Sequence, residues 1–119
     1  MFDVLLEDVN VGLVACDREG AVTHANRSAR NALGEVCEIG TPPSAWIERL
    51  RPSTPEGLAL ADADLPLVRA LHQRPAPAFN LLFHTHRGKR LFHAAAQPLR
   101  GGRRPEILGA VMVLADVRQ

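Results

Sequence analysis

Residues 12–26, GLVACDREGAVTHAN, have the pattern of two short strands joined by a tight turn and followed by a helix. Apolar segments flank the polar turn at 17–20, and Gly20 can adopt the positive φ that a hairpin return often needs. Asn26 suits the N-cap of the next helix, because its side chain can accept a hydrogen bond from a free N–H in the first turn. The stretch therefore predicts an antiparallel hairpin that leads directly into a helix.

The rest of the chain continues this pattern with helices in the middle and strands at the end. Asp64 is expected to cap the last of these helices. Short returns make neighbouring strands antiparallel, and helices between two groups of strands must cross one face of a single sheet. The sequence therefore predicts an α+β domain with helices over one face and room for a ligand between the layers. The expected helices are 2–10, 27–33, 44–50 and 65–71, and the later strands are 78–86, 91–97 and 107–115.

Composition narrows the class of protein. The 119 residues suit one domain, and 46% hydrophobic residues are enough for one core. A formal net charge of +1 lacks the positive excess of a nucleic-acid-binding protein. No apolar run reaches the roughly 20 residues of a membrane span, so we expect no membrane contact by this chain. Cys16 and Cys37 are too few for a disulfide framework and indicate a reduced, cytoplasmic protein.

The chain contains, in order, GLVACD at 12–17, Gly20, Val22, Ala25-Asn26, Leu33-Gly34, DLPLVRAL at 64–71, RGKR at 87–90, QPL at 97–99 and GAVMVLADV at 109–117. Taken together, these motifs resemble the PAS domains, a family of sensory modules in bacterial signalling proteins. The resemblance implies a five-stranded antiparallel sheet in the order 2-1-5-4-3, in a single domain over 1–119 with an amphipathic helix at about 2–10. It also implies a non-catalytic module that is joined to a C-terminal output domain, such as a histidine kinase or a diguanylate cyclase.

The resemblance also implies a signal exit near the C-terminus. Asp116 stands where many family members have an Asp-(Ile/Val)-Thr motif, but Arg118 replaces the Thr. The family's signal-transmitting helix usually begins here, so we expect an excised or truncated domain. We further expect Asp17, in the turn of the first hairpin, to contact the exit at Asp116.

Two functions follow from these expectations. In the first, a small molecule binds between sheet and helices and shifts the arrangement at the exit. In the second, the domain holds no ligand and dimerises through the N-terminal helix and the outer face of the sheet; we expect a homodimer. The candidate pocket residues for the first function are Trp46, Leu50, Leu67, Leu71, Phe83, Phe92, His93, Val111 and Val113.

Cofactor chemistry finds little support. Neither cysteine has the Asn-Cys-Arg-Phe-Leu-like helix of flavin photoreceptors, so we do not expect flavin, and the absence of Tyr argues against the photoactive chromophore type. Haem needs an axial His, and it stays a less favoured alternative because a His near a strand end is more often a solvated polar residue. His84-Thr-His86 lacks a third metal ligand, and no catalytic motif is present. We therefore predict no metal site and no enzyme activity. The candidate haem ligands are His72, His84, His86 and His93.

Overall fold

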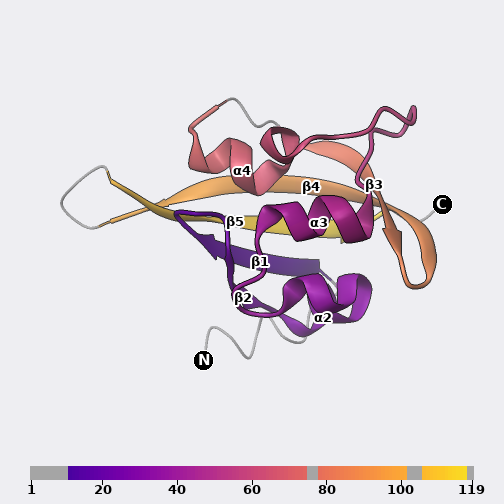
Figure 1. Cartoon of the computed structure of the whole chain (residues 1–119), viewed down its shortest axis with the longest axis horizontal. Coiled ribbons are helices and arrows are strands. Elements are labelled where there is room, and N and C mark those ends of the chain that lie inside the picture. Colours follow the sequence, from indigo (N-terminus) through magenta and orange to yellow (C-terminus); the bar gives the residue numbers. More distant parts are fainter. Residues whose placement is uncertain (1–10, 75–77, 102–105, 118–119) are drawn as a thin grey trace.

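A computed structural model describes residues 11–74, 78–101 and 106–117, so the helix predicted at 2–10 and Arg118 lie outside the described residues. The strands form one antiparallel sheet of five strands in the order β2-β1-β5-β4-β3, which confirms the predicted α+β class and strand order (Figure 1). In chain order the elements are β1 Val11–Asp17, β2 Val22–Ala25, α2 Arg27–Leu33, the 3₁₀ turn η1 Gly34–Cys37, α3 Pro43–Leu50, the 3₁₀ turn η2 Asp62–Asp64, α4 Pro66–Leu71, β3 Phe79–Thr85, β4 Gly88–Arg100 and β5 Ile107–Asp116.

The first hairpin forms as predicted, and side-chain hydrogen bonds hold its turn. The Asp17 Oδ1 atom accepts from the backbone N–H groups of Glu19 at 2.9 Å and Ala21 at 3.0 Å. Gly20 has a φ of +88°. Its missing side chain matters for a second reason, since a Cβ there would lie 2.6 Å from Pro43 Cγ at the start of α3.

Asn26 caps α2, as predicted, and also holds the helix to β1. Its Oδ1 accepts from Ala29 N at 3.0 Å inside the helix and from Leu13 N at 2.9 Å in the strand. Its Nδ2 donates to the Val11 carbonyl at 2.8 Å. Asn26 is only 5% exposed, so these bonds lie mostly out of water. One side chain therefore sets both the start of α2 and its position against the sheet.

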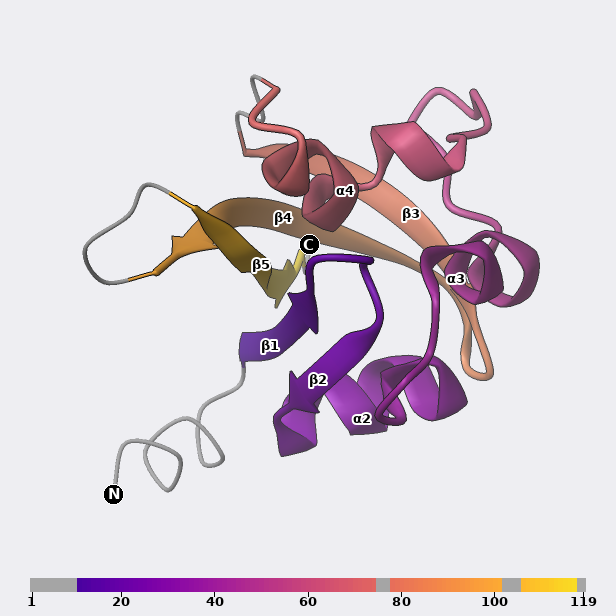
Figure 2. The same cartoon turned by 60° about the vertical axis from the view of Figure 1, so that its left-hand side comes forward.

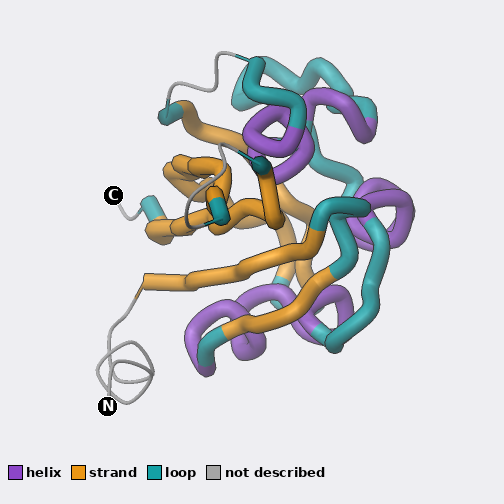
Figure 3. Tube along the Cα trace, turned by 90° about the vertical axis from the view of Figure 1, so that its left-hand side faces the viewer, coloured by secondary structure: helices purple, strands orange, loops and turns teal. Residues whose placement is uncertain are grey.

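Helices α2, α3 and α4 all lie on one side of the sheet (Figures 2 and 3). Alternate residues of each strand point into this layer and meet the apolar faces of the helices, because successive side chains of a strand point to opposite faces. None of the helices within the described ranges is long and apolar enough to cross a membrane. The main core residues are Val14, Cys16, Ala29, Leu33, Trp46, Leu50, Leu67, Val68, Leu81, Phe83, Phe92, Ala94, Ala110, Met112 and Leu114.

Two local expectations are corrected. Asp64 does not cap α4: its Oδ2 accepts from Ala61 N at 3.0 Å within η2, and Leu65 occupies the N-cap position without a side-chain bond. The helix starts at Pro66, which disfavours helical backbone in the residue before it. β4 also continues past its predicted end at residue 97 to Arg100, where it still pairs with β5. Beyond Ala94 it no longer pairs with β3, so this part of β4 is an edge of the sheet. A proline within a strand, here Pro98, is tolerated in such an edge position.

Candidate functional site

The space between the sheet and helices α3 and α4 is filled by side chains. The ring centroids of Trp46 and Phe83 lie 6.0 Å apart at 64°, and those of Phe83 and Phe92 lie 5.7 Å apart. The gap that remains beside Trp46, Leu67 and Met112 measures about 10 Å³. That is at most the room for a single water molecule. A haem or a flavin would fit there only if core side chains moved.

The predicted pocket residues divide between the two faces of the sheet. Trp46, Leu50, Leu67, Phe83 and Phe92 are buried in the core, and Leu71 packs against it half-buried. The prediction that His93, Val111 and Val113 also line this space is wrong. Their strand neighbours Phe92 and Met112 point inward, so these three side chains point to the opposite face.

The histidine side chains lie away from the core. His93 is exposed on the outer face, where its Nδ1 lies 2.9 Å from Asn80 Oδ1. His72 and His86 are exposed, and His84 is half-buried beside the loop that follows α3. None of the four lines the small interior gap. Among the described residues, no three His, Cys, Asp or Glu side chains gather closely enough to hold a metal ion.

Both cysteines are buried and free of disulfides. Burial raises the pKa of the Cys16 thiol to about 11 and that of the Cys37 thiol to about 12. Each thiol is therefore protonated near neutral pH, and the thiolate is the form that acts as nucleophile or metal ligand. Cys16 is a core residue, and its side chain packs inward from β1.

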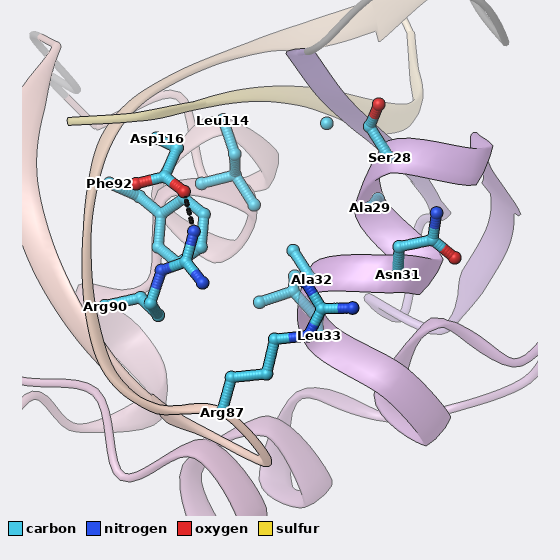
Figure 4. Close-up of a pocket in the computed structure, with 11 residues that line it drawn as sticks. Ser28, Ala29, Asn31, Ala32, Leu33, Arg87, Arg90, Phe92, Leu114 and Asp116 are labelled. Atoms are coloured by element: carbon cyan, nitrogen blue, oxygen red, sulfur yellow. Dashed lines mark hydrogen bonds and ion pairs between the residues drawn. The ribbon is translucent and has the colours of Figure 1, made fainter. Parts of the chain in front are cut away.

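The chain exit is attached to β4 by an ion pair and a backbone bond. The guanidinium of Arg90 pairs with the carboxylate of Asp116, and both side chains are partly buried (Figure 4). One residue further on, Val117 N donates to the Leu91 carbonyl at 2.9 Å. These contacts hold the end of β5 against the start of β4. Asp116 is therefore coupled to the position of β4.

The expected contact between the Asp17 turn and this exit is corrected. In the β1–β5 ladder Asp17 faces Gly109, whereas Ala115 faces Val11 at the other end. A ladder of this length spans about 20 Å, so Asp17 and Asp116 lie far apart. The hairpin borders the closing strand as expected, but antiparallel pairing carries its turn away from the exit.

A pocket of about 210 Å³ opens beside the Arg90–Asp116 pair, between α2 and the strands β1, β4 and β5 (Figure 4). Arg87, from the turn that joins β3 and β4, reaches over its rim next to Leu33, while Ser28 and Asn31 project from α2. The RGKR segment at 87–90 is one of the family motifs in the sequence, but no ligand-binding role was predicted for it. The sequence does contain a signal for this position: Arg90 lies two residues before Phe92 on β4, so both side chains point to the helix side of the sheet.

The outer face of the sheet is the second surface of interest, and we call it the open face. Its middle is apolar: Leu13 of β1, Val113 of β5 and Ala95 of β4 lie side by side across the strands, and Val113 is 40% exposed. No helix in the described part of the chain covers it (Figure 3). The residues of the open face are Val11, Leu13, Ala15, Leu91, His93, Ala95, Gln97, Val111, Val113 and Ala115.

Comparison with known proteins places the fold. No protein-family model matches the sequence, and no curated protein matches it. The structure is similar to the PAS domain of a protein from Colwellia psychrerythraea, with a TM-score of 0.66 and 16% identity over 96% of this chain and 92% of that one. It is also similar to the PAS domain of nitrogen regulation protein NR(II) from Vibrio parahaemolyticus, with a TM-score of 0.61 and 12% identity over 98% of each chain.

Both similarities extend over nearly the whole of each chain, and identities this low carry information about the fold alone. The neighbours agree with the strand order β2-β1-β5-β4-β3 and with the placement of the helices on one face. The resemblance of the sequence motifs is thereby confirmed at the level of three-dimensional structure. This chain has the fold of a PAS domain.

Proposed function

We propose that this chain is a regulatory, non-catalytic PAS domain of a cytoplasmic bacterial signalling protein, and that it acts through contact between two copies at the open face. The observation that carries the proposal is the apolar centre of that face. The solvent face of an antiparallel sheet is usually polar, so a row such as Leu13, Val113 and Ala95 is unusual without a cover.

A second copy of the chain is the occupant that suits this surface. A two-fold contact brings the same patch of both copies together, so a charge near the two-fold axis would meet its own copy. The rows around Val113 and Val111 contain only apolar residues and Gln97, and they avoid this repulsion. Residues 2–10 precede β1, which forms part of the open face, and we expect the apolar stripe predicted for them to enlarge the contact.

The filled core favours this function over a ligand held in the core between the sheet and helices α3 and α4. Ligand pockets usually enclose about 300–1,000 Å³, whereas the gap beside Trp46 is about 10 Å³. A ligand in that position would have to displace Phe83 or Met112, both less than 2% exposed and closely packed. Opening such a volume costs several kcal/mol of packing, by analogy with large-to-small core substitutions, at about 2–5 kcal/mol each.

In this proposal the exit transmits the state of the dimer to an output domain that follows residue 119. β5 contributes Val113 to the open face and ends at Asp116, two residues beyond Leu114 of the core. A shift of β5 at the dimer contact would therefore reach the Arg90–Asp116 pair directly. The sequence that follows Gln119 in the gene would show whether an output domain is present.

The oligomeric state of the chain tests the proposal. We expect the purified chain to sediment as a dimer at micromolar concentration, and Val113→Asp to sediment as a monomer, because it places two like charges in the middle of the contact. Thermal unfolding followed by circular dichroism checks that the variant is folded. Since Val113 is on the solvent side of β5, its replacement should leave the core intact.

Ile39 supplies the matched control. It is 83% exposed in the loop after η1, away from the open face, so Ile39→Asp adds the same charge elsewhere and should leave the dimer intact. A wild-type chain that stays monomeric over the micromolar range would contradict the proposal. So would a Val113→Asp variant that remains dimeric.

A further inference from the structure

We propose that the pocket beside the Arg90–Asp116 pair binds a small aliphatic monocarboxylate, and that this ligand competes with Asp116 for Arg90. The pocket lies on the helix side of the sheet, apart from both the core gap and the open face (Figure 4). The link to signalling rests on the proposed function of the exit. Binding itself does not, and it can be measured on the chain alone.

The charge of the pocket favours one negative ligand group. Two guanidinium groups, of Arg87 and Arg90, and one carboxylate, of Asp116, line it, which leaves an excess of one positive charge. Asp116 pairs with Arg90. Within the described ranges, no hydrogen bond or ion pair holds the side chain of Arg87, which projects over the rim. A carboxylate between the two arginines would gain charge-assisted hydrogen bonds from planar donors that match its shape.

The floor and the size of the pocket define the rest of the ligand. Ala29 and Leu33 of α2 and Phe92 and Leu114 of the sheet form an apolar floor. This floor suits a short hydrocarbon chain that extends from the carboxylate. The volume of about 210 Å³ is below the usual range for drug-sized ligands, so the pocket fits a molecule of a few carbons and excludes a nucleotide.

Competition with Asp116 follows from the geometry. Arg90 and Asp116 extend toward each other at the strand side of the pocket, so a ligand carboxylate at Arg90 meets the same donors that Asp116 uses. If the ligand binds more tightly to the form in which Asp116 is released from Arg90, then binding of the ligand favours that released form by the same factor, through thermodynamic linkage. The pocket would thus connect a metabolite concentration to the end of β5.

A titration of the 119-residue chain with sodium butyrate, followed by amide NMR shifts, tests the assignment. Sodium chloride keeps the ionic strength constant, since exposed charge interactions are sensitive to salt. We expect saturable shifts in α2 and at the start of β4, with a Kd of about 1 mM. Acetate, which lacks the tail, should bind about tenfold more weakly. Neutral butyramide should cause no saturable shift.

Charge variants locate the site. Arg87→Gln, at an exposed side chain, should weaken butyrate binding about tenfold or more, and Asp116→Asn should strengthen it by a similar factor because Arg90 is released. Arg49→Gln is the matched control: Arg49 pairs with Glu35 at 2.6 Å outside the pocket, so its loss should not change the affinity.

Three results would overturn the assignment. The first is the absence of saturable shifts in α2 and β4 up to about 10 mM butyrate. The second is an unchanged affinity in Arg87→Gln. The third is equally tight binding of inorganic phosphate with the same dependence on Arg87, which would make the pocket a general anion site. A monomeric chain that still binds butyrate would refute the dimer proposal and leave this one standing.

Discussion

Replacement of Asn26 by Ala is expected to be among the most damaging single substitutions at a polar residue of this domain. The side chain supplies an acceptor to Ala29 N in the helix and to Leu13 N in β1, and a donor to the Val11 carbonyl. Alanine removes all three bonds at once and adds no clash. The loss of stability therefore measures the joint value of the helix cap and of the tie between helix and strand.

The size of the effect can be built from its parts. Loss of an N-cap typically costs about 1 kcal/mol. A buried N–H or C=O group left without a partner costs about 1–3 kcal/mol. Leu13 N and Val11 O are only partly buried, so we take about 1–2 kcal/mol for each of them. The sum is about 3–5 kcal/mol, a large share of the 5–15 kcal/mol of a typical domain.

Urea unfolding followed by circular dichroism measures this loss, and the melting temperature should fall by about 10 °C or more. Asn26→Asp separates the parts, because it keeps the acceptor for Ala29 and Leu13 but cannot donate to Val11, and we expect it to lose about 1–3 kcal/mol. Asn31→Ala, at an exposed position of the same helix, should change stability by no more than about 0.5 kcal/mol. If Asn26→Ala were as mild as Asn31→Ala, the reasoning about the tie would be refuted.

Two further predictions concern the strand β5 and the buried thiols. Gly109→Ala should destabilise the fold by several kcal/mol in urea unfolding, because the added Cβ would lie 2.0 Å from the Cys16 carbonyl oxygen. Gly101→Ala is the control and should be mild, because its Cβ would meet only the Leu108 side chain at 3.3 Å. Equal losses of stability in the two variants would contradict the close approach of β1 and β5 at Gly109. Stability should also fall at alkaline pH. Folding raises the thiol pKa values of Cys16 and Cys37 from 9.0 to about 11 and about 12, so their contribution is complete below pH 9 and is lost as the pH rises through this window. Each thiol adds a slope of up to about 1.4 kcal/mol per pH unit. A variant with Cys16 and Cys37 both replaced by Ala should lose that part of the slope, and an unchanged slope would assign the alkaline loss to other groups.

Local sequence signals predicted the elements because each of them depends on neighbours in the chain. The Asp17–Gly20 turn and the Asn26 cap act over a few residues, and both are confirmed. The failure of the Asp64 cap is also local, since Pro66 sets the helix start one residue later than expected. The strand order 2-1-5-4-3 came from the resemblance to PAS domains, because pairing between distant strands leaves no signal in short windows.

The candidate site was predicted less well, for a reason of strand geometry. The chemistry and the approximate position of His93 and Val113 favour a place in the pocket, but a shift of one residue moves a strand side chain to the other face. Apolar residues occupy both faces of β5, with Met112 inward and Val113 outward. Hydrophobicity alone therefore could not show which residues of this strand point toward the helices. Only the packed helices distinguish the two faces.

The sequence by itself determined the class of the fold, the first hairpin and the Asn26 cap, since these follow from backbone preferences and short-range hydrogen bonds. Only the tertiary structure decided that Asn26 also holds β1, that the core beside Trp46 is filled, and that Arg90 pairs with Asp116 beside α2 in a pocket that Arg87 also lines. These features join residues far apart in the chain. They depend on which strand side chains point toward the helices and on how side-chain volumes fill the space between helices and sheet. Both are determined only when the elements pack together.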